Sequence, residues 1–242
     1  MFLPIRAAAA VVTALSLMVG SWNYAMPHQD PTDTLILVNK QNKAPSLKPV
    51  LVKPDVRPTS EGVAKNIYMR PVAAQALEEL FAAAEEEGVI LYATSGYRSY
   101  STQKAIYDRR VRERGKTRTE LTTAPPGYSE HQTGLAMDVE GESTKGSGLT
   151  KAFGESPEGI WLAENCYRFG FIIRYGEEWR KITGYAYEPW HIRYVGVEHA
   201  MAIKELDVPL ETYLELLRAE RINEMTQQDE VPLTTAEEGE MK

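Results

Sequence analysis

The segment Ser129-Glu-His131-Gln-Thr-Gly134-Leu-Ala-Met-Asp138 decides how this chain is organised, because it combines metal-binding side chains with a strand pattern. Gly134 permits a tight turn, and the residues after it alternate in character. The alternation predicts a strand over residues 135–139 with Ala136 and Asp138 on one face and the odd-numbered apolar residues on the other. Since the small alanine leaves room beside the aspartate, the face of Asp138 is expected to carry a site.

A second segment, Glu188-Pro-Trp-His191, supplies the remaining side chains. Pro189 disfavours the α region for the residue before it, so Glu188 and His191 are expected in an extended or turn arrangement, unlike the helical His-Glu-x-x-His of other zinc peptidases. Alternation from His191 onward predicts a second strand with Arg193 on the face of the histidine. Together the two segments offer two imidazoles, one aspartate and a spare glutamate. This set suits a zinc ion with an open coordination position and a base beside it, as in hydrolases.

The rest of the chain predicts mixed helices and strands without a regular βαβ repeat, which favours an α+β fold with a small antiparallel sheet. A helix begins at Pro71 and ends before Gly88, where apolar residues recur at helical spacing. A buried strand over residues 89–94 then leads into Ser95-Gly-Tyr-Arg98-Ser. Further elements are predicted as helices over 101–114, 157–169, 197–204 and 209–219 and a strand over 171–175.

Four regions are expected along the chain. Residues 1–26 include an uncharged apolar run, Ala7 to Gly20, and predict a signal peptide or an N-terminal membrane anchor, hence an extracytoplasmic protein. Residues 27–60 are Pro-rich and predict a linker with one short strand at Leu35-Ile-Leu-Val38. Residues 61–221 form the predicted domain, and residues 222–242 a disordered acidic tail.

Composition and charge fit a soluble globular domain, with 43% hydrophobic and 25% charged residues. The net charge is −7, of which residues 222–242 carry −5, so the acidity belongs to the tail. Nothing in this distribution indicates a nucleic-acid binder. Cys166 is the only cysteine, which excludes an intrachain disulfide and a zinc–cysteine cluster.

Several of these residues also have ordinary structural interpretations. Glu188 and Arg98 can each serve as a structural ion-pair partner, and His28 and His199 are expected to be plain surface or core histidines. The basic stretch between Lys104 and Arg118 predicts a solvated helix face, with contact to an anionic polymer as the alternative. The aromatic residues beside the second segment, Tyr185, Tyr187 and Trp190, suit either the core or a groove wall.

Four motifs, in this order, resemble the VanY-type D-alanyl-D-alanine carboxypeptidases. The likeness extends from about Leu35 to Leu217 and is specific because the motifs occur in combination. The motifs are Ser95-Gly-Tyr-Arg-Ser99, Ser129-Glu-His-Gln-Thr-Gly-Leu-Ala-Met-Asp138, Trp161-Leu-Ala-Glu-Asn165 and Tyr187-Glu-Pro-Trp-His-Ile-Arg-Tyr194.

The resemblance implies the fold of the lysostaphin, D-alanyl-D-alanine peptidase and hedgehog group, in which a small antiparallel sheet flanked by helices bears the zinc. It implies one Zn²⁺ ion held by His131, Asp138 and His191, with Glu188 as general base and Arg98 facing the scissile carbonyl. It further implies that substrate-contacting positions are occupied by Ser129, Gln103 and Ser95.

The activity implied by the resemblance is hydrolysis of the terminal D-alanine of peptidoglycan stem peptides, with a zinc-activated water as nucleophile. Two alternatives stay open: an L,D-carboxypeptidase acting on tetrapeptide stems, and a non-catalytic zinc domain that binds the cell wall. The expected partner is the stem peptide. The protein is expected to be a monomer that contacts a membrane only through its N-terminal hydrophobic segment.

Overall fold

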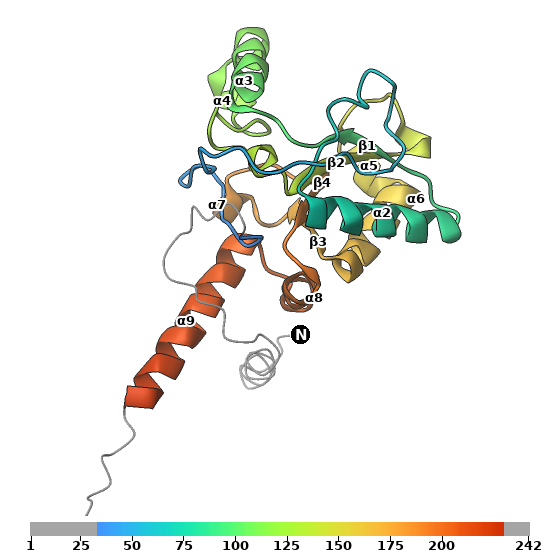
Figure 1. The fold of residues 1–242 in the computed structure, drawn as a ribbon. Helices are drawn as coiled ribbons and strands as arrows, with labels where there is room; N and C mark the ends of the chain where they lie inside the picture. Colours follow the sequence, from blue (N-terminus) through green and yellow to red (C-terminus); the bar gives the residue numbers. More distant parts are fainter. Residues whose placement is uncertain (1–32, 230–242) are drawn as a thin grey trace, which may run out of the picture. The chain divides into compact units, whose positions relative to one another are not determined.

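Four strands form a single antiparallel sheet, which confirms the expected α+β class. The computed structural model describes residues 33–229, so the predicted signal segment and the end of the acidic tail lie outside the described residues. The strand order is β1-β2-β4-β3 (Figure 1). The strands are β1 (Leu91–Ser95), β2 (Ala136–Gly141), β3 (Phe171–Tyr175) and β4 (Glu188–Tyr194).

The central pairing of β2 with β4 places the two predicted metal-binding segments side by side. Asp138 lies directly opposite His191, and Met137 lies opposite Ile192. The apolar members of both strands enter the hydrophobic core, as the alternation predicts. One face of the sheet therefore packs while the other carries polar groups.

The helices that build the core are α2 (Pro71–Glu86), α5 (Ala152–Glu155), α6 (Pro157–Asn165) and α8 (Val197–Leu206). Helix α2 begins with proline at its first position and buries Leu77 and Leu80 at helical spacing. Helix α6 is capped by the hydroxyl of Ser156, which accepts from the amide of Gly159. The predicted single helix over 157–169 instead tightens into a 3₁₀ turn, η3 (Cys166–Phe169).

Helix α3 (Tyr100–Arg114) lies apart from α2 and α6, with the short α4 (Lys116–Thr119) beside it (Figure 1). Its N-terminus is capped by Ser99, whose hydroxyl accepts from the amide of Thr102. Gln103 is the buried residue of α3, so this helix contributes little to the core and instead forms a wall. Two 3₁₀ turns, η1 (Glu130–Thr133) and η2 (Glu142–Thr144), and a short α-helix, α7 (Arg180–Thr183), complete this set of elements.

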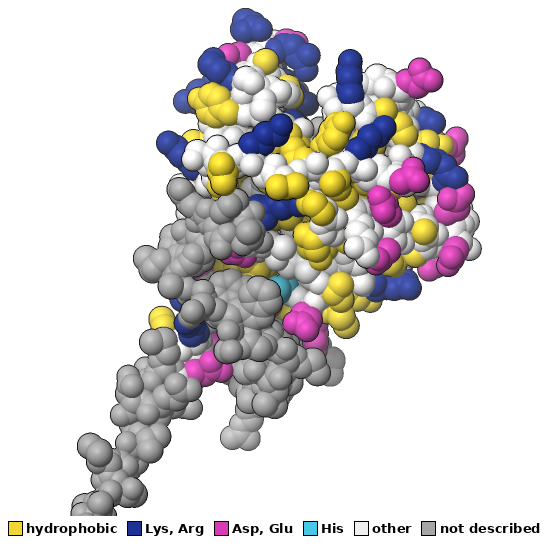
Figure 2. Space-filling model, in the orientation of Figure 1, with side chains coloured by type: hydrophobic (Ala, Val, Ile, Leu, Met, Phe, Trp, Pro, Cys, Tyr) yellow, Lys and Arg dark blue, Asp and Glu magenta, His cyan; other side chains and the backbone are white. Residues whose placement is uncertain are grey.

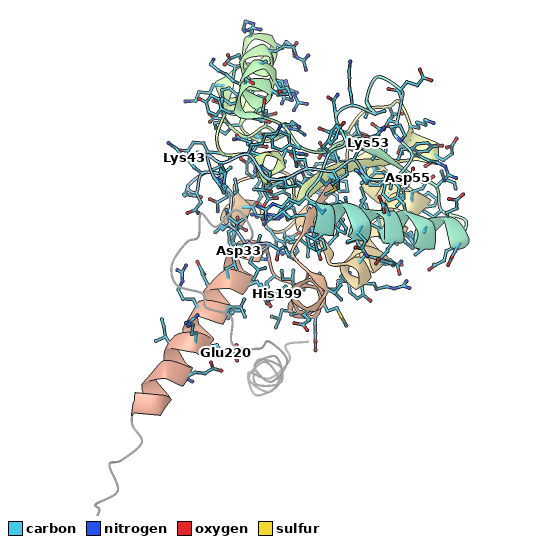
Figure 3. All side chains as sticks on the ribbon, in the orientation of Figure 1. Asp33, Lys43, Lys53, Asp55, His199 and Glu220 are labelled. Atoms are coloured by element: carbon cyan, nitrogen blue, oxygen red, sulfur yellow. The ribbon has the colours of Figure 1, made fainter. Side chains whose placement is uncertain are left out.

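The segment predicted as a linker packs against the domain, and the strand predicted at residues 35–38 does not form. Ile36 and Val38 are buried in the core. Within residues 33–229 no strand pairs with this segment; the Arg193 guanidinium instead donates to the carbonyls of Thr34 and Ile36 at 2.9 and 2.8 Å. Further on, Asp55 lies beside α2 (Figure 3), and its amide donates to a carboxylate of that helix.

Helix α9 (Leu210–Asp229) continues past residue 221, where the acidic tail was predicted to start. Its first residues, up to Glu211, belong to the same compact unit as the sheet, whereas the helix from Thr212 onward forms a separate unit. Within residues 33–229, no helix has both the length and the apolar character needed to cross a membrane.

Candidate metal centre and active site

Three side chains converge at the middle of the sheet, each from a different element. Asp138 comes from β2, His191 from the facing position of β4, and His131 from the η1 turn. One donor atom of each lies within 4.8 Å of the others, and all three residues are buried. The two imidazole rings stand nearly perpendicular, at 86°. The structure therefore brings together the three residues that the sequence singles out as metal ligands.

The orientation of His131 is set by the end of β1. Its Nδ1 lies 2.7 Å from the carbonyl oxygen of Gly96, so Nδ1 carries the proton and Nε2 is left facing Asp138. Residue 96 must be a glycine for a different contact: a Cβ there would lie 2.5 Å from the carbonyl oxygen of Tyr68, so only glycine lets this segment pack against the Ile67–Tyr68 backbone. A neutral imidazole with a free Nε2 lone pair is a suitable metal ligand.

The orientation of His191 depends on Glu130, a residue that the sequence analysis did not single out. The Nδ1 atom of His191 lies 3.1 Å from Asp138 Oδ1, and its Nε2 lies 3.2 Å from Glu130 Oε2. When Nε2–H donates to Glu130, the Nδ1 lone pair faces Asp138. Such a carboxylate behind a metal-binding histidine fixes its tautomer and ring orientation.

Glu130 is itself held by two buried arginines. Its Oε1 accepts from Arg174 Nε at 2.8 Å and from Arg193 Nη1 at 2.6 Å. Burial alone would raise the pKa of Glu130, but the two guanidinium groups hold it well below its usual range. Arg174 also forms a two-pronged ion pair with Glu211. An arginine inside a strand as apolar as Phe171-Ile-Ile-Arg-Tyr175 needs a buried carboxylate partner, which is the signal that could have revealed this network.

Arg98 shows that the cluster suits a cation. Its Nη2 lies 2.6 Å from Asp138 Oδ2 and 2.8 Å from His131 Nε2, so a positive group already contacts two of the three donors. Its other nitrogens donate to Ser95 at 2.9 Å and to Gln103 at 3.3 Å. Three residues predicted near the substrate thus form one hydrogen-bonded chain. The donor set of two imidazoles and one carboxylate is also that of catalytic zinc sites with an open position.

The pKa values of the two histidines are displaced in opposite directions. Burial and the charge of Arg98 lower the pKa of His131 to about 4. Burial would also lower the pKa of His191, but hydrogen bonds to Asp138 and Glu130 raise it to about 9. The two pKa values differ because the guanidinium of Arg98 lies beside His131, whereas the carboxylates of Asp138 and Glu130 are hydrogen-bonded to His191.

Glu188 stands at the start of β4 with its side chain buried, and its Oε1 has no hydrogen-bond partner. Burial raises its pKa to about 8, against the lowering influence of His191. A carboxyl group titrating near neutral pH can both take up and return a proton. The alternative interpretation, in which Glu188 is a structural ion-pair partner, has no support, because no ion pair involves it among the described side chains.

These groups line one pocket of about 300 Å³. Ser129 and Gln103 belong to its wall, and Gln103 is fixed by donating to the carbonyl of Ala124 at 2.7 Å. Tyr185 and Trp190 also line it, whereas Tyr187 does not. A sheet that presents a buried His–Asp–His set to a pocket, with a buried carboxyl group beside it, defines a single-zinc peptidase.

Comparison with known proteins gives the family. The family model described as VanY, D-alanyl-D-alanine carboxypeptidase, matches residues 66–197 of this chain. The chain belongs to this family, and the protein is therefore a zinc carboxypeptidase, as the sequence resemblance implies.

Three similar proteins each match most of this chain, and one of them is a structure with bound Zn(II). The protein YodJ of Bacillus subtilis (strain 168) is 46% identical over 192 residues, which cover 78% of this chain and 70% of YodJ. The structure of the LdcB LD-carboxypeptidase matches with a TM-score of 0.73 and 45% identity, covering 81% of this chain and 92% of LdcB. A VanY D,D-pentapeptidase variant from a VanB-type resistance cassette, in complex with Zn(II), matches with a TM-score of 0.63 and 38% identity over 75% of this chain and 98% of that one.

Proposed function

We propose that this enzyme removes the C-terminal D-alanine from peptidoglycan stem peptides, and that its preferred substrate is the tetrapeptide, cleaved at an L,D bond. The reaction is supported by the buried His131, Asp138 and His191 beside Glu188. The tetrapeptide preference is supported by the likeness to LdcB, described as an LD-carboxypeptidase, at 45% identity over 81% of this chain. This preference departs from the sequence-based expectation of a pentapeptide substrate.

Cleavage of the D,D bond of the pentapeptide is the second candidate. It is favoured by the family's description as D-alanyl-D-alanine carboxypeptidases and by the likeness to a D,D-pentapeptidase at 38% identity. Both candidates release the same amino acid, so the roles of the residues around the broken bond are the same.

We assign His131, Asp138 and His191 as the metal ligands and Glu188 as the general base. Bound zinc supplies Lewis-acid chemistry and lowers the pKa of a water molecule from 15.7 to about 7. Glu188 takes a proton from the attacking water and returns one to the leaving amine, a dual role suited to a pKa of about 8. A domain that only bound the wall would have no use for this buried, unpartnered carboxyl group.

Arg98 is assigned to the scissile carbonyl, where its permanent charge stabilises the negative charge that develops on oxygen. Removing one such group typically costs about 2 to 4 kcal/mol of transition-state stabilisation. Its hydrogen bonds to Ser95 and Gln103 fix the plane of the guanidinium. We assign Ser129, which lines the same pocket, to contact with the peptide backbone of the substrate.

An extracytoplasmic location is part of the proposal. The stem peptides of the wall are outside the cytoplasmic membrane, and the apolar run from Ala7 to Gly20 is typical of a segment that directs export.

Digestion of purified stem peptides tests the substrate assignment. Zinc-loaded protein is incubated separately with tetrapeptide and pentapeptide stems, and the products are weighed by mass spectrometry. Loss of one alanine from the tetrapeptide, faster than from the pentapeptide, is expected. Faster cleavage of the pentapeptide would replace the first candidate with the second, and loss of alanine from neither would refute both.

A further inference from the structure

Helices α3 and α4 carry an excess of positive charge that the rest of the chain does not share. Residues 100–119 contain seven lysines and arginines against two carboxylates, a net charge of +5, whereas the remainder of residues 1–221 carries −7. Figure 2 shows Lys and Arg side chains gathered over α3, while the Asp and Glu side chains of this face lie mainly toward α2. Arg110 is half-buried and the other six cations are exposed. We call these six the basic surface: Lys104, Arg109, Arg112, Arg114, Lys116 and Arg118.

Ion pairs within the helices neutralise only half of the basic surface. Three of its cations form i,i+4 ion pairs, which stabilise a helix. The pairs are Lys104–Asp108 at 2.6 Å, Arg109–Glu113 at 3.8 Å and Lys116–Glu120 at 3.8 Å. Arg114 donates to the hydroxyls of Thr122 and Thr123 at 3.0 and 3.2 Å, which hold the guanidinium without neutralising it. Among the described side chains, Arg112 and Arg118 form no ion pair.

Packing gives no reason for these charges either. Gln103 is the buried residue of α3, so the helix is polar on nearly all sides and contributes little to the core. Cations that lie close together repel one another, and this repulsion opposes folding. A bound polyanion would remove the repulsion. The excess of arginine is therefore better explained by a binding partner than by the stability of the helix.

The chemistry of the basic surface fits a chain of phosphate groups. Four of its six cations are arginines, whose planar fork matches the oxygens of phosphate. At about 1.5 Å per residue, the 15 residues of α3 extend roughly 22 Å, enough to meet several phosphates of an extended polymer. A helix that lies on a membrane needs an apolar face. Within α3, all of which the structure describes, Tyr100 is the exposed large apolar side chain.

We propose that the basic surface binds a linear phosphodiester polymer of the cell wall. The surface adjoins the substrate pocket, because Arg114 is exposed and also lines that pocket. Binding holds the enzyme against the wall and keeps the pocket near its stem peptides, while the polymer takes no part in the reaction. The proposal goes beyond the proposed function, since the surface can bind whether or not a peptide is cleaved.

Binding of the full-length protein to immobilised, lipid-free poly(glycerol phosphate) tests the proposal. The double variant Arg112→Gln, Arg118→Gln removes two exposed charges that lie outside the pocket. It is expected to bind at least about 10-fold more weakly than the wild type at low salt, since each cation near an anionic surface contributes a factor of about 5. Affinity should also depend less steeply on salt in the variant, because fewer counterions are released. Each single variant should show about half of the loss on a logarithmic scale.

The matched control is Lys53→Gln, Lys65→Gln, which removes two exposed charges from outside α3 and α4. It should lose less than about 2-fold in affinity, because these lysines do not belong to the basic surface. Circular dichroism checks that every variant folds.

Four results would overturn the proposal. The first is no measurable binding of the polymer by the wild type at low salt, and the second is wild-type affinity in the double variant. The third is an equal loss in the control, which would mean attraction without a defined surface. The fourth is tighter binding of the wild type to phosphatidylglycerol vesicles or to polyglutamate, which would assign the surface to a membrane or to carboxylates.

A second measurement, which rests on the proposed function, connects the surface to activity. The double variant should cleave isolated stem peptides at the wild-type rate and release alanine more slowly from walls that carry the polymer. On walls stripped of the polymer, the two proteins should be equal. Equal release from polymer-bearing walls would overturn the role of the surface, whereas cleavage of no stem peptide would refute the proposed function and leave the binding result intact.

Discussion

At the scale of single residues, the metal centre depends on side chains that do not touch the metal. The Nδ1 atom of His191 has a free lone pair for a metal when Nε2 carries the proton. Glu130 favours that tautomer, because its Oε2 lies 3.2 Å from Nε2. Glu130 in turn stays ionised inside the protein because Arg174 and Arg193 neutralise it. Glu130 thus makes three contacts, with two arginines and one metal ligand, and the arginines keep it charged for its contact with His191.

Glu130→Gln should therefore weaken zinc binding about 10- to 100-fold, the usual effect of losing such a supporting group. Zinc affinity is measured by competition with a chromophoric chelator, and folding by circular dichroism. Glu211→Gln is the matched control, because Glu211 shares Arg174 with Glu130 but does not contact His191. The control should lose stability and keep its zinc affinity.

Glu130→Asp covers the case in which the glutamine variant does not fold, since it keeps the charge but shortens the reach to His191. It should fold and bind zinc more weakly than the wild type. Equal zinc affinity in the Glu130 variants and the wild type would remove Glu130 from the metal centre.

At the scale of elements, the site is built where β1 ends against the η1 turn. The carbonyl of Gly96 accepts from His131, and the amide of Arg98 donates to the His131 carbonyl at 3.1 Å. The end of β1 is itself held against the Ile67–Tyr68 backbone, which can lie this close because residue 96 has no side chain. The end of β1 thus positions a metal ligand and the proposed carbonyl-binding arginine at once.

Gly96→Ala should cost about 1 to 3 kcal/mol of folding free energy, the usual range for overpacking, because its Cβ would meet backbone atoms of the Ile67–Tyr68 segment. Thermal unfolding measures the effect, and zinc affinity should fall with it as His131 loses its fixed partner. Gly62→Ala is the control: its Cβ has only the Ser60 hydroxyl near it, at 3.8 Å, so a change within about 0.5 kcal/mol is expected. Wild-type stability in Gly96→Ala would contradict the close approach.

The elements that could be predicted from sequence are those with local signals. Proline at the start of α2 and the alternation around Asp138 each depend on neighbours within a few residues. The 3₁₀ ending of the predicted 157–169 helix and the missing strand at 35–38 depend on tertiary contacts, among them the Arg193 bonds to Thr34 and Ile36. Such contacts leave no periodic trace in the sequence.

At the scale of the whole molecule, the chain brings its site together from distant segments. Glu130 pairs with arginines 44 and 63 positions further along the chain, and Asn39 donates to Glu211 at 3.2 Å. The three predicted ligands could be found from sequence because short motifs contain them. Their buried supports could not, because an isolated arginine in a strand does not specify which carboxylate it will meet.

The same reasoning explains why the substrate was harder to predict than the reaction. The His131, Asp138, His191 and Glu188 set indicates hydrolysis by its chemistry alone. Both candidate peptides release the same amino acid, so the residues around the broken bond do not separate them. The rest of the pocket wall combines distant segments, as where Gln103 donates to the carbonyl of Ala124, and no short motif contains such a wall.

The central claim, that a zinc ion on His131, Asp138 and His191 works with Glu188 to hydrolyse a peptide, is tested most directly by Glu188→Ala. Zinc content is measured by elemental mass spectrometry and turnover of the stem peptide under identical conditions for the variant and the wild type. One zinc per chain is expected in both proteins, with turnover in the variant lowered by at least about 100-fold, the contribution of a general base. Full turnover by the zinc-loaded variant would contradict the account.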